Sequence, residues 1–193
     1  MTNKYEYWRN QTLVNRTSSN NDIACEYYIL AMFVIDNYKD RMETIQNPLL
    51  HIISHCLELK FKDIIIFALK NNYIEGDLDK VVHDHSFYEL LPYILKIFHN
   101  ISNEQCCSPD DKKYFTTLFP ANIAKIVNIL RTDTTTYRYA EKLDKKGNFN
   151  GSGHPFVIDG ESANIINLKI LFEDCYYAIS YTSYILDYIF PQQ

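Results

Sequence analysis

Apolar residues recur every three or four positions over long stretches of this chain, the spacing that gathers them on one face of an α-helix. This periodicity predicts helices over 21–41, 48–70, 86–98 and 162–190. The last helix shows it most completely, at Leu168, Leu171, Phe172, Cys175, Ile179, Thr182, Leu186 and Ile189. Helices with one apolar stripe bury it against one another, so the pattern predicts an all-α, antiparallel bundle of about five or six helices.

Residues at the expected helix ends support these boundaries. Asn21 or Asp22 can cap the first helix, and Pro48 suits the first turn of the second, where an N–H is unpaired in any case. Ser86 and Glu89 match the Ser-x-x-Glu capping box, in which each side chain accepts a free backbone N–H. The second and third helices are therefore expected to be joined by a polar connection.

The chain beyond the third helix is more broken. Ser108 followed by Pro109 predicts another helix start, and Pro120 is expected to end that short helix before a further one begins. Residues 132–160 combine β-branched, aromatic and glycine-rich stretches. They predict an irregular excursion with a small β-hairpin ahead of the last helix.

Composition narrows the possible functions. The 193 residues suffice for one domain with a sizeable core, and only 5 are glycine, which argues against a glycine-rich phosphate loop. The net charge of −5 argues against a general nucleic-acid coat, because phosphate contacts supply most non-specific affinity. The 5 cysteines lack metal-binding spacing, and no disulfide framework is expected. No cofactor is indicated, and any RNA binding is expected at a local basic patch.

The N-terminal residues are polar and lack the apolar segment of a signal peptide. Residues 1–20 are therefore expected to form an arm ahead of a helical domain over 21–193. No apolar run reaches the length of roughly 18 residues that a membrane-spanning helix needs. These features predict a cytoplasmic location and no membrane partner.

Three polar side chains of the second helix could share a metal ion. His51, His55 and Glu58 are spaced at i, i+4 and i+7, which places them on one face, and metal sites use histidine pairs at this spacing. The alternative is a polar stripe in which Glu58 pairs with Lys62 one turn further on. The stripe is favoured, because no second ligand pattern is visible on a facing helix.

A His-Asp-His sequence, His83 to His85, precedes the third helix. Asp84 could orient a neighbouring imidazole, and a helix start favours an anion such as phosphate. The alternative is a helix-entry motif whose polar groups satisfy the loop backbone. His83 and His85 are thus candidate catalytic residues with a structural explanation beside them.

A local basic cluster lies in the excursion before the last helix. Arg138 can hold a phosphate and Tyr139 can stack on a base. Lys142, Lys145 and Lys146 follow closely. These five residues are the candidate RNA or phosphate site.

Two of these side chains carry further interpretations. Arg138 could instead pair with a buried acid such as Asp84 or Glu58 and hold the excursion against the bundle. His154 lies in a Gly-Ser-Gly-His-Pro turn, where it is either an exposed loop residue or another candidate catalytic residue, if folding or a dimer interface brings it near His83 or Arg138. Arg138 and His154 therefore join the histidines of the His-Asp-His sequence as the candidates for catalysis.

The stretch PLLHIISHCLELKFKDII resembles the second helix of HEPN-like helical proteins, in which an apolar run leads to a histidine and then Glu-Leu-x-x-Lys. His55, Glu58, Leu59 and Lys62 match that pattern. Later matches are the His-Asp break at His83-Asp84 and the Leu-Leu pair at Leu90-Leu91. They continue with the Arg-Tyr pair at Arg138-Tyr139 and the acidic-Lys-Gly turn at Asp144-Lys145-Lys146-Gly147. The resemblance spans residues 20–190.

This resemblance implies a helical bundle, a tendency to dimerise, and RNA-linked roles in stress and antiviral defence. It does not extend to the HEPN ribonuclease signature, an arginine followed after four to six residues by a histidine. No arginine of the chain has a histidine at that spacing, as inspection shows for Arg9, Arg16, Arg41, Arg131 and Arg138. The nuclease residues of the family therefore have no counterparts here.

The favoured hypothesis is an RNA-associated or regulatory HEPN-like protein of a prokaryotic antiviral defence or toxin–antitoxin type system. It is expected to be non-catalytic and to act as a homodimer through its tyrosine-rich last helix, with RNA and a cognate protein as candidate partners. One alternative is a metal-independent endoribonuclease in which Arg138 stabilises the phosphate and His83, His85 or His154 moves the proton of the 2′-hydroxyl. The other alternative is a purely structural dimeric interaction module.

Overall fold

The structure, a computed structural model, describes residues 19–38, 42–130 and 165–191. Within these ranges every element is helical, which confirms the all-α class. The elements are α2 (Asn20–Tyr38), α3 (Met42–Lys70), α4 (Leu78–His83), α5 (Phe87–Ser102), α6 (Pro109–Lys113), the π-helical turn η2 (Tyr114–Leu118), α7 (Phe119–Leu130) and α8 (Ile165–Ile189).

Several predictions concern residues outside the described ranges. They are the hairpin within 132–160 and most of the arm predicted over 1–20, of which only Ser19 and Asn20, at the start of α2, are described. The candidate residues Arg138, Tyr139, Lys142, Lys145, Lys146 and His154 also lie outside the described residues.

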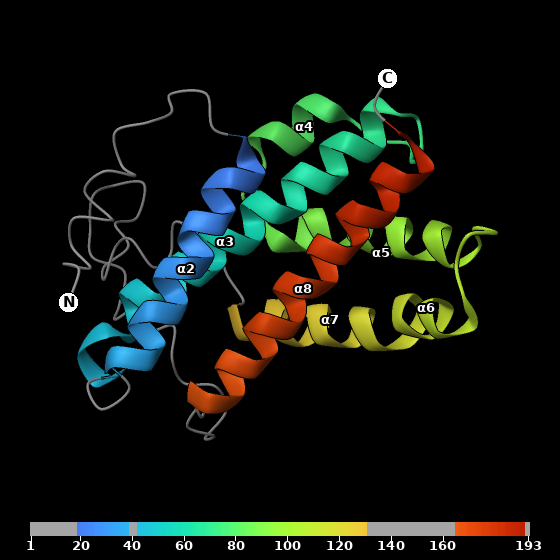
Figure 1. Cartoon of the computed structure of the whole chain (residues 1–193). Helices are drawn as coiled ribbons and strands as arrows, with labels where there is room; N and C mark the ends of the chain where they lie inside the picture. Colours follow the sequence, from blue (N-terminus) through green and yellow to red (C-terminus); the bar gives the residue numbers. More distant parts are fainter. Residues whose placement is uncertain (1–18, 39–41, 131–164, 192–193) are drawn as a thin grey trace, which may run out of the picture.

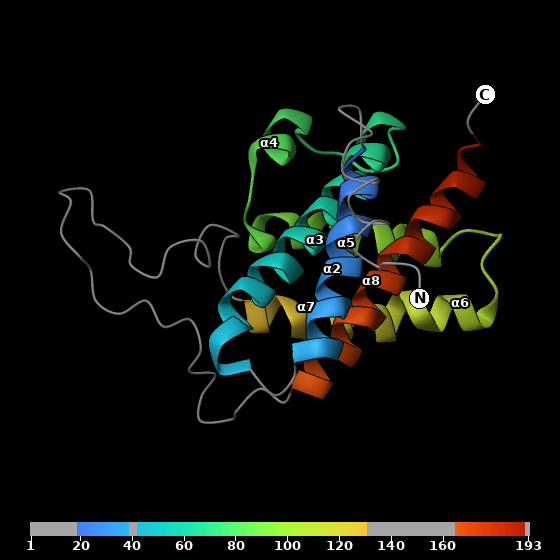
Figure 2. The same cartoon turned by 60° about the vertical axis from the view of Figure 1, so that its left-hand side comes forward.

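Helix α3 is the central element of the bundle (Figures 1 and 2). Helices α2, α4, α5 and α8 all contact it, while α7 contacts α5 and α8. The sequence of α3 explains this position, because its buried apolar side chains spread over about half of the helix circumference, as at Cys56, Leu57 and Ile65. A helix with so wide an apolar surface must be covered by several neighbours.

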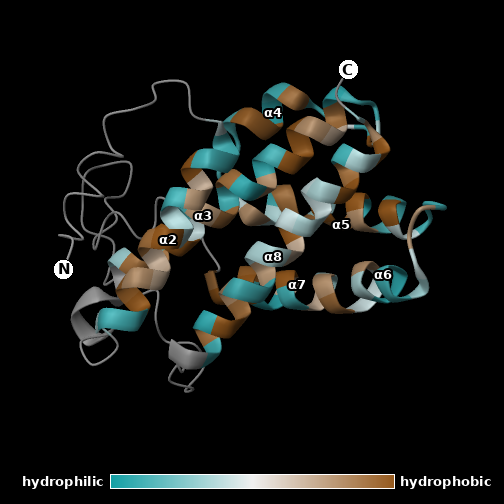
Figure 3. Cartoon of the chain, in the orientation of Figure 1, coloured by the Kyte–Doolittle hydropathy of each residue, from teal (hydrophilic) through white to brown (hydrophobic). Residues whose placement is uncertain are grey.

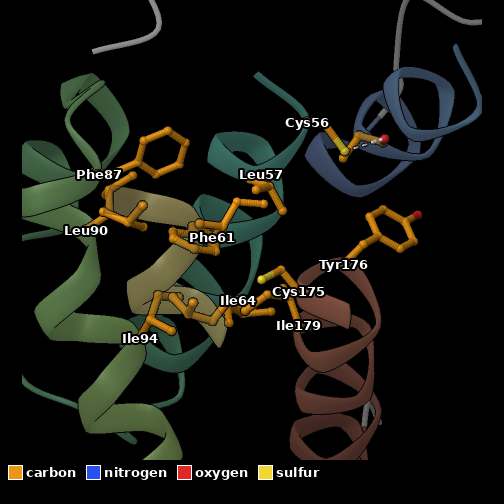
Figure 4. Close-up of a cluster of buried hydrophobic side chains, with 14 of the residues drawn as sticks. Cys56, Leu57, Phe61, Ile64, Phe87, Leu90, Ile94, Cys175, Tyr176 and Ile179 are labelled. Carbon is orange, nitrogen blue, oxygen red and sulfur yellow. Dashed lines mark hydrogen bonds between the residues drawn. The ribbon is translucent and has the colours of Figure 1, made fainter. Parts of the chain in front are cut away.

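The core forms where α3, α5 and α8 meet (Figure 4). Phe61 of α3 meets Phe87 of α5 edge to face, with 5.6 Å between ring centroids. Ile94 of α5 and Ile179 of α8 complete this region and are fully buried. The stripe predicted on the last helix is confirmed, since all its members are buried except Ile189, which is half-buried. Apolar residues recur between polar ones along the helices, as expected of amphipathic helices that pack on one side (Figure 3).

The N-terminal ends of the first two long helices differ from the prediction. Ser19, rather than Asn21 or Asp22, caps α2: the backbone N–H of Asp22 donates to Ser19 Oγ (3.1 Å), and the Ser19 N–H donates back to Asp22 Oδ2 (3.1 Å). Helix α3 begins at Met42, so Pro48 lies inside it and not in its first turn. One proline removes only one backbone hydrogen bond, and the long buried run that follows it continues the helix.

The capping box predicted at Ser86 and Glu89 is wrong, although α5 begins at the next residue after Ser86. The Ser86 hydroxyl makes no capping hydrogen bond. Glu89 instead accepts a hydrogen bond from Lys80 Nζ (2.7 Å), because the short helix α4, which the sequence pattern did not reveal, places that lysine opposite it. The start predicted at Ser108 is confirmed, where this residue forms a capping box with Asp111.

The prediction that Pro120 ends a short helix is also wrong. Helical structure continues from Pro109 to Leu130 through η2. In η2 the backbone N–H of Phe119 reaches back to the carbonyl of Tyr114, which is the wider spacing of a π-turn. A proline lacks an N–H and its ring crowds the preceding turn, so a widened turn accommodates it without ending the helix.

The apolar length of the helices and the state of the cysteines can be compared with the expectations from composition. Among the described helices, none is both long and apolar enough to cross a lipid bilayer. The cysteines are all free thiols, and three of them, Cys56, Cys107 and Cys175, are buried as small apolar side chains. The buried thiol of Cys56 also donates a hydrogen bond to the Ala24 carbonyl of α2 (3.2 Å; Figure 4).

Two leucines of α5 provide a matched test of this packing. Leu90 is fully buried, whereas Leu95 is 38% exposed on the same helix. We expect Leu90→Ala to lower the free energy of unfolding by about 2–5 kcal/mol and Leu95→Ala to lower it by about 1 kcal/mol or less, because only the first leaves a cavity. Urea unfolding followed by circular dichroism measures both, and equal losses would contradict the packing described.

Candidate functional site

A buried carboxylate, Glu58, lies where α3, α4 and the connection to α5 meet. Its side chain is only 2% exposed. Its Oε1 accepts hydrogen bonds from Lys62 Nζ (3.0 Å) and His85 Nδ1 (2.8 Å). A buried charge is tolerated only when it is paired and hydrogen-bonded, and these two donors provide that pairing. Glu58, Lys62, His85 and the adjacent His55 are called the Glu58 cluster below.

Lys62 connects α3 to α4. Its ammonium group is nearly buried and also donates a hydrogen bond to the backbone carbonyl of Val82 (3.0 Å). Val82 belongs to the last turn of α4, where helix carbonyls lack partners within the helix and the helix end is partially negative. Lys62 therefore neutralises Glu58 and satisfies the end of α4 at the same time.

The second oxygen of Glu58 faces His55. The distance from Glu58 Oε2 to His55 Nδ1 is 3.6 Å, close enough for electrostatic attraction but too long for a hydrogen bond, and neither atom has a hydrogen-bond partner among the described residues. Burial on its own raises the pKa of Glu58. The polar groups of His55, Lys62 and His85 outweigh that effect and lower the pKa to about 2. Glu58 is therefore ionised at neutral pH.

His85 is the exposed member of the Glu58 cluster. Its side chain is 56% exposed although its Nδ1 contacts the buried carboxylate. An ionised carboxylate can only accept hydrogen bonds, so Nδ1 carries the ring proton and donates a hydrogen bond to Glu58. In the neutral imidazole Nε2 is then an acceptor, and no described residue pairs with it. This orientation, with one nitrogen held by a carboxylate and the other at the surface, suits acceptance of a proton by the neutral ring and contact with an anion when the ring is protonated.

The other residues of the His-Asp-His sequence lie outside this cluster. His83 is the last residue of α4, highly exposed, with its Nδ1 2.9 Å from the Asp79 carbonyl of its own helix. Asp84 accepts a hydrogen bond from the Ser86 N–H (2.8 Å) and so satisfies the loop backbone. The residue that orients an imidazole is Glu58 and not Asp84.

The residues considered for a metal ion have a different arrangement. The rings of His51 and His55 stack with centroids 6.0 Å apart, and the Tyr27 ring meets His55 edge to face at 4.8 Å. The part of the chain that the structure describes contains no group of three or more His, Cys, Asp or Glu side chains that could hold a metal ion. Glu58 forms the ion pair with Lys62 that the polar-stripe interpretation expected, but the pair is buried.

Sequence reasoning also missed a second buried cation on α3. Lys60 is only 5% exposed. Its ammonium group donates a hydrogen bond to Asn21 Oδ1 of α2 and lies 4.7 Å from the ring centroid of Tyr176 of α8. A charged residue within the wide apolar surface of a helix is a signal for such a site, but the sequence does not identify its partners.

We expect the ionised Glu58 to stabilise the fold at neutral pH and to lose this contribution in acid. Its pKa falls from an ordinary 4.5 to about 2 on folding, so the unfolded chain takes up the proton first as the pH falls. The free energy of unfolding should therefore decrease as the pH falls from about 4.5 to about 2. Glu58→Gln should lower it at neutral pH by on the order of 3 kcal/mol and should weaken this acid dependence.

Urea unfolding across that pH range measures both effects. Glu75→Gln, which neutralises an exposed carboxylate in the connection before α4, is the control and should leave stability nearly unchanged. An acid dependence identical in the Glu58→Gln variant and the unaltered protein would contradict this role of Glu58.

Comparison with known proteins adds no identification. No protein-family model matches the sequence, and no curated protein or solved structure matches it.

Proposed function

We propose that this protein is an RNA-associated, regulatory HEPN-like protein of an antiviral defence or toxin–antitoxin type system, and that it binds RNA without cleaving it. The single observation that carries the proposal is the exposed imidazole of His85, held by the buried, ionised Glu58 at 2.8 Å. The family assignment rests on the sequence resemblance around Glu58 and Lys62.

The fixed ring of His85 suits a phosphate contact. A side chain that is already oriented loses little conformational freedom on binding. When the imidazole is protonated, both of its nitrogens donate, so Nδ1–H remains on Glu58 while Nε2–H is available to a phosphate oxygen. The contact would be charge-assisted, the stronger class of hydrogen bond.

His85 alone does not make an RNA surface. The side chains of Asp77, the N-cap of the neighbouring α4, and of Asp79 within it are exposed and acidic, which opposes phosphate binding. In the proposal, the additional positive charge comes from the predicted basic cluster of Arg138, Lys142, Lys145 and Lys146, with Tyr139 stacking on a base.

The absence of the family's arginine–histidine signature from the sequence favours binding over cleavage. The geometry nevertheless supports one alternative, a metal-independent ribonuclease. In that alternative Nε2 of His85, oriented by Glu58 at 2.8 Å, accepts the proton of the 2′-hydroxyl as a general base. The carboxylate–histidine hydrogen bond is the specific observation that favours it.

We expect the protein to bind RNA with a steep dependence on salt and to leave the RNA intact. His85→Ala should weaken binding about three- to tenfold through loss of one charge-assisted contact, and Arg138→Ala should weaken it by a similar factor. Fluorescence anisotropy with a labelled single-stranded RNA at several salt concentrations measures affinity. Electrophoresis of total RNA after incubation with and without chelator measures cleavage.

His99→Ala is the matched control, because His99 is an exposed histidine on α5 outside the Glu58 cluster. It should not change affinity. Cleavage that is lost in the His85→Ala variant would replace the binding proposal with the ribonuclease. If the protein neither binds nor cleaves RNA, both RNA hypotheses are contradicted, and the purely structural dimeric interaction module is favoured.

The proposed dimer uses the outward side of α8. Ile170, Tyr177, Tyr184 and Tyr188 are all exposed there and recur at about two-turn and one-turn spacing along the helix. A seam of this kind can pair with the same seam of a second copy about a twofold axis. Tyrosine is enriched in such interfaces because its ring buries apolar area while its hydroxyl stays solvated.

We expect Tyr184→Glu to disrupt the dimer, because it places a charge in the middle of the paired seam. Sedimentation velocity over a range of protein concentrations should show a dimer for the unaltered chain and a monomer for this variant. Tyr88→Glu makes the same change at an exposed tyrosine of α5 and should leave the dimer intact. A monomeric unaltered chain at all concentrations would contradict the proposed dimer.

A further inference from the structure

A pocket between the η2–α7 segment and α8 has a different chemistry from the Glu58 cluster. Its volume is about 370 Å³. Its principal lining residues are four aromatic side chains and two carboxylates: Tyr114, Phe119, Tyr177, Tyr181, Asp111 and Asp174. None of the residues that line it is basic.

The π-turn of η2 assembles the aromatic part of this pocket. In a regular α-helix, residues five apart point to different sides, whereas the wider turn of η2 brings Tyr114 and Phe119 together. Their rings stack with centroids 5.5 Å apart and planes inclined by 19°. Phe119 also meets the Tyr181 ring at a steep angle, with 6.4 Å between centroids. Turns of this type occur frequently at functional sites.

The carboxylates give the pocket a negative charge. Asp111 accepts hydrogen bonds from the Tyr181 hydroxyl (2.6 Å), the Ser108 hydroxyl (2.6 Å) and the Ser108 N–H (3.0 Å). The bonds from Ser108 and Tyr181 lower the pKa of Asp111, so it is ionised at neutral pH. Asp174 accepts a long hydrogen bond from Asn122 (3.4 Å). In the described ranges, no ion pair joins either aspartate to a basic side chain.

We propose that this pocket binds a quaternary ammonium group of about the size of choline. Aromatic faces attract organic cations, and the two aspartates add long-range attraction. Asp111 already accepts three hydrogen bonds, nearly the full capacity of a carboxylate. A cation without N–H groups needs no further acceptor from Asp111, and the aromatic faces and the charge of Asp174 attract it without a hydrogen bond. The proposal is independent of RNA binding by His85. Because Tyr177 also belongs to the surface proposed for the dimer, choline and a second copy of the chain would compete for this side of α8.

The test uses the full chain with labelled tyrosine rings, followed by nuclear magnetic resonance during titration with choline. The comparison ligand is 3,3-dimethylbutan-1-ol, which has the same shape and no charge. We expect choline to shift the rings of the pocket and to bind about tenfold more tightly than the neutral compound. A peptide with one trimethyl-lysine tests the same chemistry on a protein side chain, and its affinity relative to choline identifies the source of the group.

Two variants and one control locate the site. Asp174→Asn should weaken choline binding about threefold or more without changing binding of the neutral compound, and Tyr114→Leu should weaken it similarly. Glu173→Gln removes the same charge at the neighbouring position of α8, which does not line the pocket, and should have little effect. Circular dichroism verifies that each variant is folded.

Equal affinity for choline and the neutral compound would overturn the proposal, because it would reduce the pocket to an apolar depression. Equal weakening by Glu173→Gln and Asp174→Asn would also overturn it, because the effect would then arise from overall charge. Absence of any shift of the Tyr114, Tyr177 and Tyr181 rings at high choline concentration would exclude the site.

Discussion

The constraint on which this structure depends is the pairing of one charge inside a helix that is covered on several sides. An unpaired carboxylate in such a position costs several kcal/mol. Glu58 is paired by Lys62 of its own helix and by His85 from the connection before α5. Lys62 in turn holds the Val82 carbonyl of α4. Apolar contacts bring α3, α5 and α8 together, whereas the Glu58 cluster determines where α4 and the following connection attach.

The long helices could be predicted from sequence because each buries a regular stripe, as α8 does. The short helix α4 could not, since only Val81 of its residues is buried and no periodicity results. The prolines at 48 and 120 are poor guides to the helix ends, because the buried run after Pro48 continues α3 and the widened turn of η2 accommodates Pro120. The sequence singles out Glu58 as a candidate metal ligand or ion-pair partner and His85 as a candidate catalytic residue. Their meeting across 27 positions depends on how α3 and α4 pack, which local spacing does not encode.

The chain divides its polar chemistry between two places. In the Glu58 cluster a buried negative charge is matched by a lysine, and one edge of the His85 ring is left at the surface, where the proposed ligand is a phosphate that contacts the protonated ring. In the pocket beside α8, ionised Asp111 lies among aromatic rings without a basic partner in the described residues, and a cation is the complementary ligand. The first arrangement follows from burial in α3 and the second from the π-turn that stacks Tyr114 on Phe119.

The most direct test of this account is the titration of Glu58 itself. Nuclear magnetic resonance of side-chain carboxyl carbons in the folded protein follows each glutamate as the pH falls. The account predicts that Glu58 titrates near pH 2, well below its ordinary value of 4.5. A Glu58 carboxyl that titrates at or above the ordinary value would show that burial, and not pairing with Lys62 and His85, governs this residue, and would contradict the central claim.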